Sequence, residues 1–109
     1  MNGESGQEEF DCPPVPAFPG ALVRDIPIIN KKGLHARATA KFVQCVDKFT
    51  CDIKVHRCGE TVGGTSIMGI LTLGAGIGTT ITVAAKGDDA QAALDAIAAL
   101  CAGRFGEES

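Results

Sequence analysis

The order in which two hydrophobic periodicities follow one another constrains the fold of this chain most. Apolar and polar residues alternate over 51–57 and 79–86, as in half-buried strands, whereas apolar residues recur every three or four positions over 36–48 and 90–102, as in amphipathic helices. In full, the predicted strands cover 22–29, 51–57, 60–62 and 79–86, and the predicted helices cover 36–48, 67–71 and 90–102. This order, β-α-β-β-α-β-α, predicts an α+β fold in which a four-stranded antiparallel sheet carries three helices on one face.

The two ends of the chain lack such a period. Residues 1–20 combine acidic residues with four closely spaced prolines, a composition that does not support a packed core. We therefore predict a flexible N-terminal extension over 1–20, one folded domain over 21–104 and a flexible C-terminal tail over 105–109.

Charge and hydropathy exclude two classes of partner. The formal net charge is −3 and the lysines and arginines are scattered, which argues against nucleic acid. No run approaches the roughly 20 apolar residues that a membrane span needs, and the start of the chain is acidic, unlike a signal peptide. These features predict a cytoplasmic protein without membrane insertion.

The cysteines and histidines show no metal-binding pattern. Five cysteines at irregular spacing include no CxxC pair, and the two histidines are not flanked by cysteines, so we expect no metal site. An odd number of cysteines in a cytoplasmic protein also favours free thiols over a disulfide framework.

One histidine stands where chemistry with an anion is favoured. His35 follows the turn at Gly33 and directly precedes a predicted helix, whose first N–H groups lack intrahelical partners and can bind phosphate. Arg37 can add a planar guanidinium, and the small side chain of Ala36 leaves the approach open. A lone histidine at this position is more often a cap or a surface residue, and His56, which lacks both features, keeps that structural interpretation.

Two motifs add a family resemblance. The segment Gly33-Leu34-His35-Ala36-Arg37 is similar to the active-site signature of the HPr family, the histidine phosphocarriers of the phosphoenolpyruvate-dependent phosphotransferase system (PTS). The segment from Thr65 to Gly74, TSIMGILTLG, resembles that family's second signature, and the similarity extends over about residues 23–103. The resemblance implies the HPr-like open-faced sandwich, in agreement with the predicted order of elements.

The resemblance also implies a function. A phosphoryl group would pass from an enzyme I type protein to His35, with help from Arg37, and then to an EIIA-type domain, so that the chain is a carrier and not an enzyme, and needs no cofactor. Ser66 would be the regulatory site of an HPr kinase/phosphorylase. Ala38 departs from the family, many members of which have proline there, but alanine also starts a helix well.

Several alternatives stay open from the sequence. Ser66 after Thr65 is also a good helix N-cap, which is a purely structural role. The short helix after it cannot bury all its apolar residues, so we predict a partner-binding surface near His35 and expect a monomer that docks several partners in turn. The residues assigned to this surface are Ala36, Ile67, Met68 and Ile70. A regulatory interaction module controlled by Ser66 is the alternative to a carrier, and the acceptor belongs to either a sugar or a nitrogen branch, with a slight preference for the second.

Overall fold

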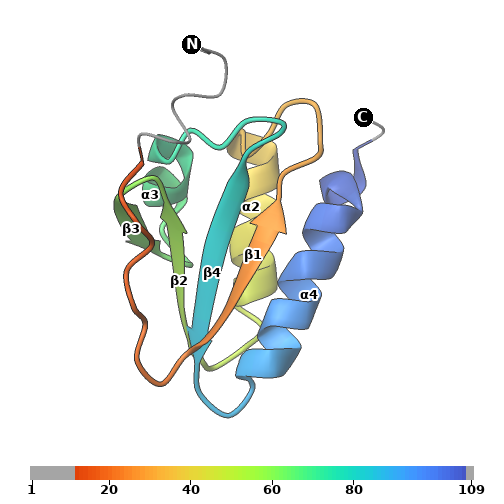
Figure 1. Ribbon diagram of the computed structural model, residues 1–109. Coiled ribbons are helices and arrows are strands. Elements are labelled where there is room, and N and C mark those ends of the chain that lie inside the picture. The colour runs from red at the N-terminus through yellow and green to blue at the C-terminus, as the bar shows by residue number, and fades with distance from the viewer. Residues whose placement is uncertain (1–11, 108–109) are drawn as a thin grey trace.

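The computed structural model describes residues 12–107 and has the predicted order of elements (Figure 1). The elements are β1 (Leu22–Pro27), α2 (Ala36–Val46), β2 (Asp52–Arg57), β3 (Glu60–Gly63), α3 (Ile67–Thr72), β4 (Thr80–Lys86), α4 (Ala90–Ala102) and a short 3-10 turn, η1 (Arg104–Gly106). The strands form one antiparallel sheet in the order β1-β4-β2-β3. The predicted α+β open-faced sandwich is therefore confirmed, and the ends of the strands and α-helices either coincide with the prediction or differ from it by one or two residues.

The core lies between the sheet and the helices behind it in Figure 1. Alternate residues of β2 and β4 face the helices, as the sequence pattern predicts, and Val55 and Val83 pair across these strands with no exposed surface. Phe42 of α2 and Ile97 of α4 are fully buried against this layer. Because the inward positions are all apolar, the pattern fixes which face of the sheet the helices cover.

A glycine turn sets the start of α2. Gly33 has φ of +65°, a left-handed conformation that favours glycine, and a Cβ atom there would lie 2.5 Å from the carbonyl oxygen of Ala75. The neighbouring Leu34 donates its N–H to the same carbonyl at 2.9 Å. The turn before α2 is therefore packed directly on the loop before β4.

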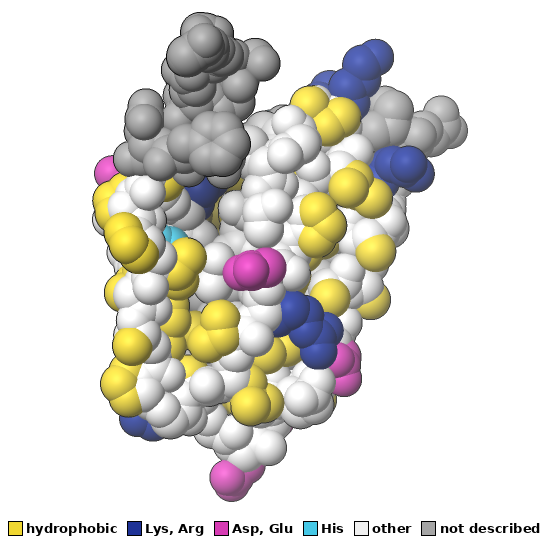
Figure 2. Space-filling view, in the orientation of Figure 1, with side chains coloured by type: hydrophobic (Ala, Val, Ile, Leu, Met, Phe, Trp, Pro, Cys, Tyr) yellow, Lys and Arg dark blue, Asp and Glu magenta, His cyan; other side chains and the backbone are white. Residues whose placement is uncertain are grey.

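Residues 12–20 run along the face of the sheet that no helix covers. Phe18 packs its ring edgewise on His56 of β2 with centroids 6.4 Å apart, and Pro13 lies close to Gly59 in the β2–β3 turn. The sequence predicts a flexible extension over 1–20, whereas its described part lies against the sheet; residues 1–11 lie outside the described residues. Figure 2 shows apolar side chains gathered along this segment and on the sheet beside it.

A disulfide fixes one end of this segment. Cys12 and Cys58 are bonded, with Cα atoms 4.7 Å apart, so the prediction of free thiols only is wrong for this pair. The other three cysteines, Cys45, Cys51 and Cys101, are free. Burial raises the pKa of the Cys101 thiol to about 12, which keeps it protonated and unreactive at neutral pH.

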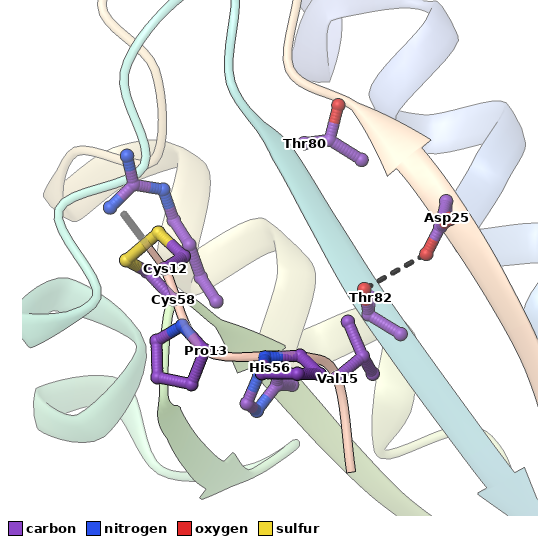
Figure 3. Close-up of a pocket in the computed structure, with 10 residues that line it drawn as sticks. Cys12, Pro13, Val15, Asp25, His56, Cys58, Thr80 and Thr82 are labelled. Carbon is purple, nitrogen blue, oxygen red and sulfur yellow. Dashed lines mark hydrogen bonds between the residues drawn. A yellow bond between two sulfur atoms is a disulfide. The ribbon is translucent and has the colours of Figure 1, made fainter. Parts of the chain in front are cut away.

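The segment changes the environment of the outward side chains on the sheet. His56 is only 3% exposed although it lies on the polar face of β2, and its Nδ1 pairs with the hydroxyl of Thr61 at 2.8 Å. Thr82 of β4 is also buried, and its hydroxyl donates to Asp25. A pocket remains between Val15 and these strands (Figure 3).

Reduction of the disulfide is expected to lower the free energy of unfolding by about 2–4 kcal/mol, because the bond closes a loop between cysteines 46 residues apart and restricts the unfolded chain. Chemical denaturation with and without a dithiol reductant measures this difference. The Cys58→Ser variant serves as the control and should not respond to reductant. Equal stability of the wild-type protein under both conditions would contradict the expectation.

Candidate functional site

His35 is the N-cap residue of α2. Its backbone is extended (φ −80°, ψ −175°), and its carbonyl oxygen accepts the first helical hydrogen bond, from the N–H of Thr39, at 2.8 Å. Its side chain makes no capping bond and is 28% exposed. The ring is therefore free for another role, while the first N–H groups of α2 still lack helical partners and can bind an anion.

The imidazole contacts a carboxylate that the sequence prediction missed. Nε2 of His35 lies 2.5 Å from Oε2 of Glu107, and Oε1 of the same carboxylate accepts a hydrogen bond from Nδ2 of Asn30 at 3.1 Å. Asn30 is fully buried, and its Nδ2 also donates to the carbonyl of Gly33 at 2.8 Å. The hydrogen bond from His35, and next the one from Asn30, hold the pKa of Glu107 below its ordinary value.

The chain reaches this position through a turn after α4. Arg104 and Phe105 both have positive φ, +56° and +54°, and reverse the chain so that it returns to the start of α2. Phe105 is 1% exposed, and its carbonyl accepts a hydrogen bond from Nζ of Lys41 at 2.6 Å. The tail predicted over 105–109 is thus packed in its described part, residues 105–107; residues 108 and 109 lie outside the described residues. The sequence feature that could have indicated this packing is Phe105, a lone aromatic residue shortly after the predicted helix 90–102.

The other residues of the first turn divide between surface and core. Ala36 and Arg37 are exposed, and within residues 12–107 the guanidinium of Arg37 has no hydrogen-bond partner. Ala38 is fully buried, and α2 begins normally with alanine at this position. Arg37 is therefore available to an incoming phosphoryl group or to a partner protein.

Ser66 is the N-cap of α3. Its backbone is extended, and its exposed hydroxyl oxygen accepts a hydrogen bond from the N–H of Gly69 at 3.1 Å. A Cβ atom at Gly69 would lie 2.7 Å from this oxygen and 2.9 Å from Cβ of Val62, so the cap needs glycine there. The capping role is thus observed, and the hydroxyl also faces solvent where an enzyme can reach it.

The apolar residues of α3 separate into two groups. Ile67 is 44% exposed and Met68 is 71% exposed, as expected for a partner-binding surface. Ile70 has no exposed surface and belongs to the core, so its assignment to that surface is wrong. In a helix of six residues only one side faces the core, and Ile70 lies on that side of α3. The start of α2 and α3 lie at the same end of the molecule (Figure 1).

Comparison with known proteins gives a consistent result. Residues 22–102 match the family model PTS-HPr, described as the PTS HPr component phosphorylation site. Phosphocarrier protein HPr of Cupriavidus necator is 52% identical over 86 residues, which cover 79% of this chain and 97% of that protein. Phosphocarrier protein NPr of Shewanella violacea is 43% identical over 88 residues, 81% of this chain and 97% of that protein.

Solved structures agree with the sequence matches. The crystal structure of HPr-C-His from Thermoanaerobacter tengcongensis superposes with a TM-score of 0.77 at 42% identity, over 81% of this chain and 99% of that chain. The family match begins at the first residue of β1 and runs to the last residue of α4, and so it covers every strand and every α-helix that the structure describes. The chain belongs to the HPr family of phosphocarrier proteins.

Proposed function

We propose that His35 accepts a phosphoryl group from a phosphorylated enzyme I and passes it to an EIIA-type domain. The observation that carries this proposal is the geometry of His35, whose partly exposed ring stands at the start of α2 and is not used to cap it. A phosphoryl group on the ring would lie beside helix N–H groups and the positive end of the helix dipole. The exposed guanidinium of Arg37 would neutralise the charge of the phosphoryl oxygens during transfer.

The chain acts in this scheme as a carrier, since enzyme I consumes the phosphoenolpyruvate and the phosphoryl group then passes from His35 to the acceptor. We place it in the cytoplasm with these partners, as a monomer that presents the same face to each. None of the helices in residues 12–107 is long and apolar enough to cross a membrane. Ala36, Ile67 and Met68, which are exposed, would form the surface that these partners contact.

Intact mass after incubation with enzyme I and phosphoenolpyruvate tests the acceptor step. We expect one added phosphoryl group that acid removes, as is typical of a phosphoramidate. Omission of enzyme I is the control and should leave the mass unchanged. The absence of any adduct would overturn the carrier proposal and favour a regulatory module controlled through Ser66.

Ser66 is the proposed target of an HPr kinase/phosphorylase, and its replacement has two expected effects. The Ser66→Ala variant should accept no phosphate from the kinase, and it should lose roughly 1 kcal/mol of stability because the cap of α3 is removed. Intact mass and chemical denaturation measure the two effects. The Thr65→Ala variant changes the neighbouring exposed hydroxyl and should show neither. Phosphorylation of Ser66→Ala would place the regulatory site elsewhere.

A further inference from the structure

We propose that Cys12 and Cys58 form a reversible thiol–disulfide site that low-molecular-weight thiols open. Its redox state decides whether residues 12–20, the covering segment, stay on the outer face of the sheet, which no helix covers. Figure 3 shows the disulfide at one end of this segment and Val15 farther along it, beside His56. The site goes beyond the proposed function and stands whether or not His35 carries a phosphoryl group.

The disulfide is accessible from solvent. Cys58 is exposed and lies in the tight turn between β2 and β3, where it and Gly59 have positive φ of +48° and +86°. The pairing of Arg57 with Glu60 closes this turn, so that Cys58 keeps its place in the folded domain when the bond to Cys12 opens. Exposed disulfides of this kind are the ones that exchange readily with thiols.

The covering segment has few other contacts that hold it. Within the described chain, no backbone hydrogen bond joins residues 13–20 to a strand. Phe18 is half-buried and packs its ring edgewise on His56, whereas Val15 is 52% exposed. Burial of part of one aromatic ring does not offset the conformational entropy lost when the whole segment is ordered. We therefore expect the segment to leave the sheet once the disulfide is reduced.

His56 reports whether the segment is in place. Its side chain points to the outer face of β2, as does that of Lys54 two residues earlier. Lys54 is exposed, whereas His56 lies under the covering segment and is almost fully buried. Departure of the segment should therefore open the imidazole of His56 to solvent while the sheet beneath it stays paired.

Reduction proceeds by two exchange steps. The thiolate of one reductant molecule attacks one sulfur, the bond between Cys12 and Cys58 breaks, and its electron pair leaves with the other sulfur, which takes up a proton. A second reductant thiolate then attacks the mixed disulfide and releases the remaining cysteine, which is also protonated. The chain thus gains two electrons and two protons, and the two reductant molecules become one disulfide.

The site is built to close again. Residues 13–21 still tether Cys12 to β1 after reduction, so the two thiols meet at a high effective concentration and an oxidised thiol pool re-forms the bond. In the cytoplasm, where we place the chain, thiols are kept reduced and disulfides are usually transient and redox-sensing. The covered sheet would there mark oxidising conditions, and the open sheet would be the resting state.

Glutathione buffers with rising ratios of reduced to oxidised form test the site on the full chain under native conditions. After acid quenching, unfolding and alkylation, intact mass should show three alkylated thiols in the oxidised chain and five in the reduced chain. Return to an oxidised buffer should restore three. Circular dichroism should show that the chain stays folded throughout.

Two further measurements follow the covering segment itself. The nuclear Overhauser contact between the rings of Phe18 and His56 should disappear on reduction. The rate at which diethyl pyrocarbonate modifies His56 should rise several-fold, while His35, which is already partly exposed, serves as the internal reference and should react at the same rate in both states.

Cysteine variants provide the controls. The Cys12→Ser and Cys58→Ser variants should show an accessible His56 in every buffer. The Cys51→Ser variant changes a free thiol at the start of β2, keeps the disulfide and should respond like the wild-type protein. A disulfide that opens only when the chain unfolds, or a contact between Phe18 and His56 that persists in the reduced chain or in the Cys12→Ser and Cys58→Ser variants, would overturn the proposal.

Discussion

The His35→Gln variant should accept no phosphoryl group from phosphorylated enzyme I, because glutamine has no imidazole nitrogen and the chain has no other histidine at the start of α2. The fold should persist, since the imidazole does not cap the helix and the carbonyl of residue 35 still accepts the hydrogen bond from Thr39. The contact with Glu107 that this variant loses is partly exposed to solvent, so its loss should change stability little. Intact mass shows the missing group, and circular dichroism checks the fold.

His56 provides the control for this experiment. It is the second histidine of the chain, lies beneath residues 12–20 and forms a hydrogen bond with the hydroxyl of Thr61. The His56→Gln variant, studied at a temperature where it is folded, should accept one acid-labile phosphoryl group like the wild-type protein. Labelling of His35→Gln, or loss of labelling in His56→Gln, would show that His35 is not the acceptor.

The Phe42→Ala substitution should have the largest effect on stability, a decrease of about 3–5 kcal/mol in the free energy of unfolding. Phe42 is fully buried on the inner face of α2, in the core between this helix and the sheet. Its removal eliminates buried apolar contacts and leaves a cavity that a close-packed core fills only in part. The same helix positions His35, so the site and the core depend on one another.

The midpoint of denaturant unfolding, monitored by circular dichroism, measures this loss. Phe49 lies beyond the end of the same helix and is only partly buried, so Phe49→Ala should cost clearly less than Phe42→Ala. Equal losses for the two variants, or a loss below about 1 kcal/mol for Phe42→Ala, would mean that α2 does not pack as described.

The sequence was sufficient for features that depend on local pattern. Alternation over β2 and β4 identified the buried face of the sheet, and the helical spacing of Phe42 with its neighbours identified α2. His35 could be singled out because the glycine turn, the histidine and the helix start are adjacent in the chain. Such features can be predicted because they depend on residues that are close together in the sequence.

Other features depend on contacts between distant residues, and the sequence did not predict them. Cys12 and Cys58 meet only because the N-terminal segment lies back across the sheet. Glu107 reaches His35 through a turn in which Phe105 has positive φ. Non-glycine residues seldom adopt this conformation, and the local sequence pattern does not predict it. The burial of His56 has the same origin, since the covering segment comes from the far end of the chain.

The central claim is that the phosphoryl group on His35 is passed on, and transfer from the isolated phosphorylated chain tests it most directly. The chain is phosphorylated with enzyme I and phosphoenolpyruvate, separated from both, and mixed with an EIIA-type domain of the sugar branch or of the nitrogen branch. Intact masses of both proteins are then followed over time. We predict that the chain loses its phosphoryl group as at least one of the two EIIA-type domains gains one. Loss of the group only to water, with neither domain modified, would contradict the carrier function.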